Sequence, residues 1–244
     1  MPDTAALKRH VREIERCNQR GGRMLSVVDL LADGTIARDL AAYALASISG
    51  GCSFMVGALP GGAGKTTVMG ALLNFVPADV ELIAADSIAV IERGASTPIP
   101  RACFICHEIG SGPYYAYLWG EELRAYFDLP RAGHMLATNL HADTFEQAHD
   151  QVCGSNGVPE AAFRRMNLLF FLSLEREGFR TTRRIAELWE SDGSRPHTRI
   201  FGTGQALNGG LASTAAMQGA RAKLDEMVAR DIRQIAAVRE HLVR

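Results

Sequence analysis

The residues best suited to chemistry lie in one glycine-rich stretch, Leu59–Thr67, which reads Leu-Pro-Gly-Gly-Ala-Gly-Lys-Thr-Thr. It stands between a short apolar run, Ser53–Val56, and a helical pattern that begins at about Lys65. Glycines permit backbone conformations that turn successive N–H groups inward, and the N-terminal end of the helix adds positive potential. Lys65 would reach the β- and γ-phosphates of a nucleotide, and the Thr66 hydroxyl would ligate Mg²⁺. The stretch therefore predicts a phosphate-binding loop of the Walker A type, with ATP and Mg²⁺ as its ligands.

The nucleotide contacts that we predict come from the whole loop. They are Pro60, Gly61, Gly62, Ala63, Gly64, Lys65, Thr66 and Thr67. The Walker A pattern asks for a small residue, usually glycine, five positions before Gly64. This chain has Leu59 at that position and a glycine, Gly57, two positions earlier. The alternative interpretation is a glycine-rich turn without function.

Two further side chains are candidates for catalysis because each follows a predicted strand. Glu108 comes just after the run Cys103–Cys106 and would activate water or hold the Mg²⁺ shell. His141 follows Met135–Leu140 and would sense the γ-phosphate through a hydrogen bond. The carboxyl ends of parallel strands meet at the edge of the sheet where α/β proteins bind ligands. A solvated loop acid and a structural histidine are the alternative interpretations.

A third catalytic candidate is Asp86, which follows the apolar run Val80–Ala85. It would polarise the attacking water as a general base. Its side chain is short, and Glu92 is the fallback for the same role.

The sequence Cys103-Phe-Ile-Cys-His107 spells the pattern of covalent haem attachment. It lies in a predicted core strand, where alternation sends Cys103 and Cys106 to opposite faces. The two thiols therefore neither pair nor share a metal ion, and we interpret the segment as buried strand.

Apolar runs that alternate with helical segments predict an α/β fold around a mostly parallel sheet. The predicted parallel strands are Ser53–Val56, Val80–Ala85, Cys103–Cys106 and Met135–Leu140. Met166–Leu174 and Arg180–Trp189 predict an antiparallel pair joined by a turn at Glu175–Gly178. These elements belong to one predicted domain, residues 25–201.

Helical patterns flank that domain on both sides. Residues 5–19, Val27–Ala32 and Ile36–Ser49 have helical periodicity, and Gly202–Ser213 has the composition of a linker. Thr214–Arg244 predicts one final amphipathic helix. We therefore divide the chain into an N-terminal helix with its linker (1–24), the P-loop domain (25–201), and a linker with a C-terminal helix (202–244).

Several segments, in order along residues 25–190, resemble the ATPases of type II and type IV secretion, pilus and archaellum systems. Leu25–Ile36 is similar to the segment that precedes their core, and Ala71–Asp79 to the end of their P-loop helix. The other matches, given by the family's own names, are Leu82–Ser87 (Asp box), Phe104–Ile109 (Walker B), Gly133–Ala142 (His box) and Leu174–Leu188 (the late strand pair). The resemblance implies a RecA-like P-loop core that works as a hexameric ring and hydrolyses ATP to drive assembly or transport.

The chain departs from this family pattern in three ways. The large N-terminal domain, which contributes arginines to the nucleotide site, has no counterpart here. Glu108 is followed by Ile109-Gly-Ser rather than arginine, and the stretch between Asp box and Walker B is short. In a ring, Arg180, Arg183 and Arg184 are candidates to supply a cation to a neighbouring subunit; the alternative is that these three only solvate a surface hairpin. The alternatives are a non-hydrolysing nucleotide-binding partner of such a complex and, ranked last, a small-molecule P-loop kinase.

Composition excludes several classes of protein. Hydrophobic residues make up 47% and charged residues 22% of the 244 residues, and the formal net charge is -1. These values give no indication of nucleic-acid binding. No apolar run reaches the roughly 18 residues of a membrane span, and the N-terminus lacks a signal-peptide core. Five unevenly spaced cysteines fit a reduced compartment. We expect a cytoplasmic protein, attached to the inner membrane only through partners in a membrane complex.

Overall fold

The apolar runs form one mostly parallel sheet whose strands lie in the order β2-β3-β5-β1-β6-β7-β8, with β4 paired to β3. The computed structural model describes residues 4–18, 21–59, 61–96, 99–177, 180–202 and 204–243. Pro60, one of the predicted nucleotide contacts, lies outside them. The strands are β1 (Phe54–Gly57), β2 (Glu81–Ala84), β3 (Ala102–Ile109), β4 (Tyr117–Leu118), β5 (Met135–Leu140), β6 (Leu168–Glu177), β7 (Arg180–Glu190) and β8 (Thr198–Gly202). The α/β prediction is confirmed.

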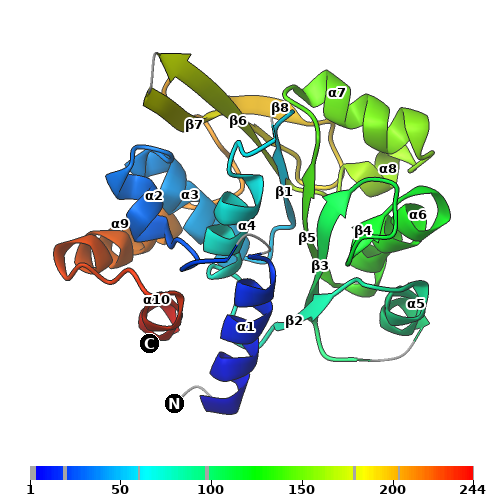
Figure 1. Cartoon of the computed structure of the whole chain (residues 1–244), viewed down its shortest axis with the longest axis horizontal. Coiled ribbons are helices and arrows are strands. Elements are labelled where there is room, and N and C mark those ends of the chain that lie inside the picture. Colours follow the sequence, from blue (N-terminus) through cyan, green and yellow to red (C-terminus); the bar gives the residue numbers. More distant parts are fainter. Residues whose placement is uncertain are drawn as a thin grey trace.

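Helices cover both faces of the sheet, which gives three layers (Figure 1). On one face lie α1 (Thr4–Arg16), α2 (Val27–Ala32), α3 (Arg38–Ser49), α4 (Lys65–Leu73), α9 (Thr214–Ala229) and α10 (Ile235–Leu242). On the other face lie α5 (Ile88–Ser96), α6 (Gly120–Asp128), α7 (Phe145–His149) and α8 (Glu160–Phe163). A 3₁₀ turn η1 (Leu129–Ala132) and a π-helical turn η2 (Asp150–Ser155) complete the described elements.

The central strands are buried on both faces because each packs against a helical layer. Every residue of β1, β3 and β5 is buried. Along β3, Cys103 belongs to the core under α1–α4 and Cys106 to the core under α5–α8, as strand alternation predicts. Both thiols are free.

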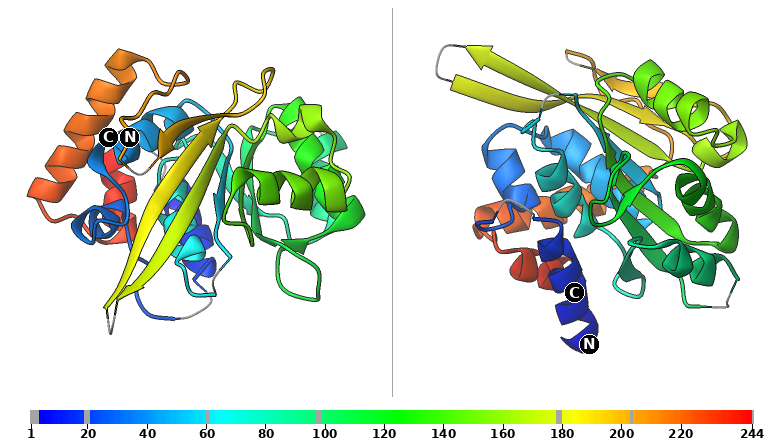
Figure 2. Two further views of the ribbon diagram at one scale, coloured as in Figure 1. Left: turned by 90° about the horizontal axis from the view of Figure 1, so that it is seen from above. Right: turned by 45° about the vertical axis from the view of Figure 1, so that its right-hand side comes forward.

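The antiparallel pair β6–β7 forms as predicted, but its strands are longer than the apolar pattern indicated. β6 continues to Glu177, so the segment predicted as a turn at Glu175 is still strand. Figure 2 shows this two-stranded ribbon extending past the helical layers, where Glu175, Thr181 and Arg183 are exposed. The edge strand β8, which the sequence did not predict, pairs with β7.

The C-terminal region folds back on its own chain as two helices, and the prediction of one helix over Thr214–Arg244 is wrong. Asp231, in the break between α9 and α10, has φ +50°. The break redirects α10 so that Arg239 reaches the C-terminal end of α4, where it donates to the carbonyl oxygens of Asn74 and Pro77 at 2.7 and 3.1 Å. α9 packs along α3, with ion pairs Arg38–Asp225 and Arg221–Asp39 at 3.0 Å each. No helix in the described ranges combines the length and apolarity needed to cross a membrane.

Candidate nucleotide-binding site

The glycine-rich loop connects β1, in the middle of the sheet, to α4. Gly62 and Gly64 have φ +84° and +98°, a left-handed conformation that is strained for residues with a Cβ. Gly64 is the N-cap of α4, whose first N–H groups have no intrahelical acceptors. The loop and the helix end therefore direct N–H groups and positive potential to one place, as an anion site requires.

The departure from the Walker A pattern at Leu59 has a structural account. The Leu59 side chain is 47% exposed, and its N–H donates to Asp143 Oδ1 at 2.6 Å, which anchors the start of the loop. Gly57 is needed for packing instead, because a Cβ there would lie 2.6 Å from the Ala142 carbonyl oxygen. Gly57 therefore does not replace the missing loop glycine.

The structure brings three predicted site residues, Lys65, Glu108 and His141, into one group. The Lys65 ammonium donates to the Ala58 carbonyl oxygen at 3.1 Å and to His141 Nδ1 at 3.2 Å. It lies 3.7 Å from Glu108 Oε2, and His141 Nε2 lies 3.9 Å from the same oxygen. Because an ammonium only donates, Nδ1 accepts in this pair, and the same nitrogen lies 3.4 Å from the Leu59 carbonyl oxygen, while Nε2 lies beyond hydrogen-bond distance of the carboxylate.

Burial changes the protonation of this group. It raises the pKa of Glu108 to about 7, although the nearby Lys65 charge acts in the opposite direction. Burial and Lys65 together lower the pKa of His141 below its usual value, so the imidazole is neutral at pH 7. Glu108 thus lies close to the midpoint of its titration at neutral pH, which suits a group that accepts a proton.

One oxygen of Glu108 has no hydrogen-bond partner in the part of the chain that the structure describes. Glu108 is 6% exposed, and its Oε1 atom is fully buried without a donor. Buried polar atoms in folded proteins are nearly always paired with protein groups, water or a ligand. The orphaned oxygen therefore fits a site that is completed by a bound water or metal–nucleotide complex.

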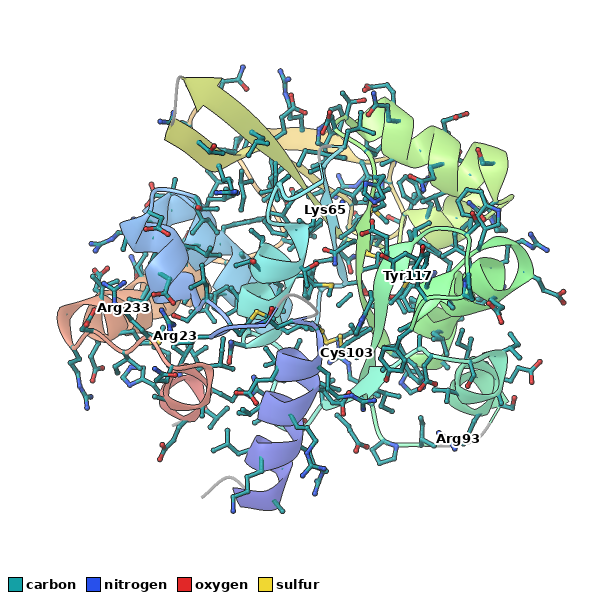
Figure 3. The ribbon with its side chains drawn as sticks, in the orientation of Figure 1. Arg23, Lys65, Arg93, Cys103, Tyr117 and Arg233 are labelled. Carbon is teal, nitrogen blue, oxygen red and sulfur yellow. The ribbon has the colours of Figure 1, made fainter. Side chains whose placement is uncertain are left out.

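The loop opens into a cavity of about 660 Å³, a size typical of small-molecule sites. Glu108, Tyr117 and His141 line one part of it, and β7 contributes Thr181–Arg183. The wall beside α4 comes from residues between Asn18 and Thr35. Arg23 in this wall forms a two-point ion pair with Asp29, at 2.7 and 2.9 Å, and Arg233 approaches the same carboxylate (Figure 3).

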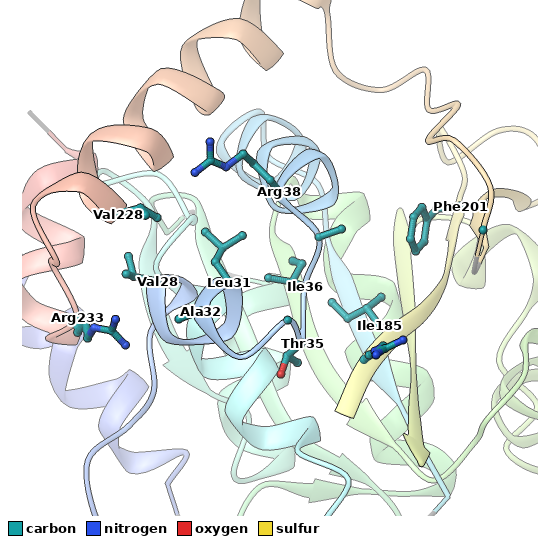
Figure 4. Close-up of a pocket in the computed structure, with 14 residues that line it drawn as sticks. Val28, Leu31, Ala32, Thr35, Ile36, Arg38, Ile185, Phe201, Val228 and Arg233 are labelled. Carbon is teal, nitrogen blue, oxygen red and sulfur yellow. The ribbon is translucent and has the colours of Figure 1, made fainter. Parts of the chain in front are cut away.

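Arg183 of β7 contacts the loop of its own chain. Its Nε donates to the Gly62 carbonyl oxygen at 3.2 Å, and a Cβ on Gly64 would lie 3.4 Å from its Cδ. The sequence had suggested this arginine as a donor to a neighbouring subunit or as a solvated hairpin residue, and not as a contact within the chain. Its neighbour Arg184 instead lines a separate, mostly apolar pocket of about 490 Å³ between α2, α3, β7, β8 and α9 (Figure 4). The Arg180 side chain lies outside what the structure describes.

Asp86 does not join this group. It is exposed after β2, accepts from the Ser87 hydroxyl at 3.3 Å, and is not among the described residues that line the cavity. Its carboxylate lies within electrostatic range of Arg16 and Tyr115. Glu92, the fallback, is exposed on α5 and does not line the cavity either. Sequence reasoning missed Tyr117, which carries no motif, and it gave the segment Leu25–Ile36 a family resemblance but no place in the site.

Comparisons with known proteins bear on part of the fold. No family model matches the chain, and no curated protein matches it by sequence. The VirB11 ATPase from the Brucella suis type IV secretion system, solved with sulphate, aligns at a TM-score of 0.43 with 20% identity, covering 60% of this chain and 50% of that one. The Legionella pneumophila ATPase DotB aligns at 0.41 with 10% identity, covering 75% and 54%.

This chain therefore spans about half the length of the two solved proteins. Both are ATPases by name, and the first comes from a type IV secretion system. At this identity and these TM-scores the likeness carries no argument about function, which has to be made from the site itself.

Proposed function

We propose that this chain binds Mg-ATP through the loop Gly61–Thr67 and hydrolyses it with Glu108 as the general base. One observation carries the proposal: a glycine loop with left-handed Gly62 and Gly64 holds Lys65 3.7 Å from a buried carboxylate whose other oxygen has no partner among the described residues. A glycine-rich turn without function would not require a buried glutamate next to its lysine.

Phosphate binding falls to the loop and the first turn of α4. The N–H groups after Gly64 and the helix dipole attract the phosphates, and Lys65 exchanges its contact with the Ala58 carbonyl for phosphate oxygens. Thr66 and Thr67, half-buried in the same turn, line the cavity. Mg²⁺ bound with the nucleotide would neutralise charge on the phosphates, and Thr66 and Glu108 are the residues that would hold it.

Hydrolysis needs a water molecule that loses a proton as its oxygen attacks the γ-phosphorus. Glu108 accepts that proton, the bond from the γ-phosphorus to the ADP oxygen breaks, and ADP and phosphate leave. His141 would sense the γ-phosphate, because it lines the cavity next to Lys65 and Glu108. A role for Asp86 as general base remains a proposal only for a conformation in which its side chain moves toward the cavity.

The wider role that we propose is that of a motor subunit in a secretion, pilus or archaellum complex, working as a homo-oligomeric ring in the cytoplasm. This part rests on the family resemblance of residues 25–190. Arg183 changes one part of this proposal. Its side chain contacts the phosphate loop of its own subunit, which reduces the need for a cation from a neighbouring subunit.

A second candidate function is a nucleotide-binding subunit that does not hydrolyse ATP. It is favoured by the position of Asp86 outside the cavity, which leaves Glu108 as the one acid among the predicted catalytic residues in the site. Such a subunit would regulate an assembly through nucleotide occupancy alone.

Two measurements on the same preparation separate these functions. Calorimetry with Mg-ATP gives the affinity, and phosphate release without an added acceptor gives turnover, with Lys65→Ala as the control for contaminating ATPases. Binding together with release supports the ATPase. Binding with release no greater than that of Lys65→Ala favours the regulatory subunit. A wild-type chain that does not bind Mg-ATP overturns both.

A further inference from the structure

Three potential metal ligands of different chemistry meet on the helical layer formed by α7, η2 and α8. The His149 imidazole, the Cys153 thiol and the Glu160 carboxylate each offer one atom, and these atoms all lie within 4.8 Å of one another. His149 Nε2 forms a short hydrogen bond with Glu160 Oε1. In the described ranges this is the one such group of three, and its residues belong neither to the phosphate loop nor to its cavity.

The local fold fixes the spacing of these residues. Thr144 caps α7 by accepting from the Gln147 N–H at 3.3 Å, and the helix continues into the π-helical turn η2, which carries Cys153 four residues after His149. Isolated π-helical turns are rare and occur frequently at functional sites. Residues this far apart lie on one side of a helix, so the imidazole and the thiol face the same way.

The connection after η2 brings Glu160 close to His149 and Cys153. Asn156 bridges elements there, accepting from the Gly120 N–H at 2.6 Å and donating to the Gln151 carbonyl oxygen at 2.7 Å. The Val158 N–H donates to the Val152 carbonyl oxygen at 3.2 Å. The connection is therefore held by several hydrogen bonds, and Glu160 begins α8 directly after it.

Aromatic packing orients the imidazole. The His149 ring lies 6.1 Å from the Phe145 ring and 5.8 Å, edge to face, from the Phe163 ring. The side that carries Nε2 faces Glu160 and remains open, since His149 and Glu160 side chains are 39% and 54% exposed. An ion could enter from solvent without unfolding either helix.

We propose that His149, Cys153 and Glu160 form a binding site for one divalent metal ion of the Zn²⁺ class. Imidazole nitrogen, thiolate sulfur and carboxylate oxygen are the protein ligands of Zn²⁺, whereas Mg²⁺ and Ca²⁺ select oxygen alone. Three protein ligands on an open surface leave a fourth, tetrahedral position for water. Coordination takes the thiolate form of Cys153, so binding releases its proton to solvent. The bound ion would join η2 to α8.

Co²⁺ provides the test, because a thiolate ligand gives it a charge-transfer band in the near ultraviolet and tetrahedral geometry gives visible d–d bands. Protein purified without a polyhistidine tag is stripped with chelator and titrated with Co²⁺, and then with Zn²⁺ in competition. We expect one Co²⁺ per chain with both spectral features, and their loss when Zn²⁺ displaces it. Cys153→Ser should remove the charge-transfer band, and Glu160→Gln should weaken binding about tenfold or more.

Cys52→Ser is the matched control, since Cys52 is also half-buried and free but lies outside the group. It should retain the wild-type spectrum. Circular dichroism of each variant with chelator present shows whether the fold is intact before metal is added. Wild-type protein that gives no thiolate band, or a band that persists in folded Cys153→Ser, overturns the site; His149 and Glu160 then form a hydrogen bond between helices and nothing more.

Discussion

The two ends of helix α4 are completed in opposite ways. At its N-terminal end the N–H groups after Gly64 face a cavity of about 660 Å³, where the proposed phosphate ligand would pair with them. At its C-terminal end Arg239, 2% exposed, donates to the carbonyl oxygens of Asn74, Val76 and Pro77. The helix dipole favours an anion at the first end and a cation at the second. The chain itself supplies the cation, and under the proposed function a bound phosphate would supply the anion.

The C-terminal end of α4, which we call the closed end, is completed by α10 and α1, the last and first helices of the chain. Arg239 belongs to α10, and its second terminal nitrogen lies 2.7 Å from Nδ1 of His10 in α1. Burial, with the Arg239 charge, lowers the pKa of His10 to about 4, so the imidazole is neutral and accepts the hydrogen bond. Segments predicted to lie outside the P-loop domain thus complete its central helix. The division at residues 24 and 202 remains a prediction, but it cuts through these contacts.

The largest effect should come from removing Lys65, the cation at the N-terminal end of α4, which we call the open end. Lys65→Ala should weaken Mg-ATP binding by about 2–5 kcal/mol, because phosphates at the loop lose their charged partner. Calorimetry measures the loss, and Lys8→Ala, an exposed lysine of α1, is the control. Unchanged affinity in a folded Lys65→Ala variant would mean that the loop does not bind the phosphates.

Glu108→Gln should separate binding from chemistry at the same end. The amide keeps the size of the side chain but accepts no proton, so turnover should fall by about 10²-fold or more. ATP affinity should change far less. Phosphate-release assays and calorimetry give the two numbers. Turnover within a few-fold of wild type would pass the catalytic role to Asp86 or Glu92.

A substitution at the closed end should lower the free energy of unfolding but leave nucleotide binding unchanged. Arg239→Met keeps the apolar stem but leaves buried carbonyl oxygens without donors, which should cost about 3 kcal/mol. Urea unfolding measures this cost, and the affinity of the folded fraction for Mg-ATP should stay within a few-fold. Arg230→Met is the matched control: its ion pair with Glu226 is exposed and should contribute at most about 1 kcal/mol. Equal destabilisation by both variants would contradict the capping role.

The pattern of residues predicted the open end and could not have predicted the closed one. Glycines that need positive φ, a lysine and a following helix form a local signal, and Gly62, Gly64 and Lys65 lie where it indicates. Arg239 acts on residues more than 160 positions away, through a break in the last helix that no proline or glycine marks. Arg183 was missed as a contact within the chain for a similar reason: strand register, which the sequence does not specify, brings it to Gly62.

Acidity gives a further way to probe the open end. Folding raises the pKa of Glu108 from 4.5 to about 7, so the protonated form is favoured in the folded state. Between these values the folded chain binds more protons than the unfolded one, and the stability that Glu108 contributes falls as pH rises through this window. Catalysis needs the ionised form, so kcat/KM should rise toward a plateau above about pH 7. The Glu108→Gln variant should lose this pH dependence of stability. A wild-type kcat/KM that stays constant from pH 5.5 to 8 would contradict the assignment of Glu108 as the general base.

The smallest effect should come from Arg183, which adds a cation at the edge of the open end. Its side chain is exposed and holds the loop through one hydrogen bond, so Arg183→Ala should weaken Mg-ATP binding by about 1 kcal/mol, roughly fivefold. Arg184→Ala is the matched control, because that neighbour lines the separate apolar pocket and should leave the affinity unchanged.

Mixing Arg183→Ala with Lys65→Ala then tests which subunit the arginine serves. If Arg183 acts within its own chain, each variant carries its defect alone, and the mixture has the average of the two activities. If it acts on a neighbour in a ring, mixed assemblies contain wild-type pairs of loop and arginine, and activity rises above that average. The hydrogen bond from Arg183 to Gly62 of the same chain predicts the average.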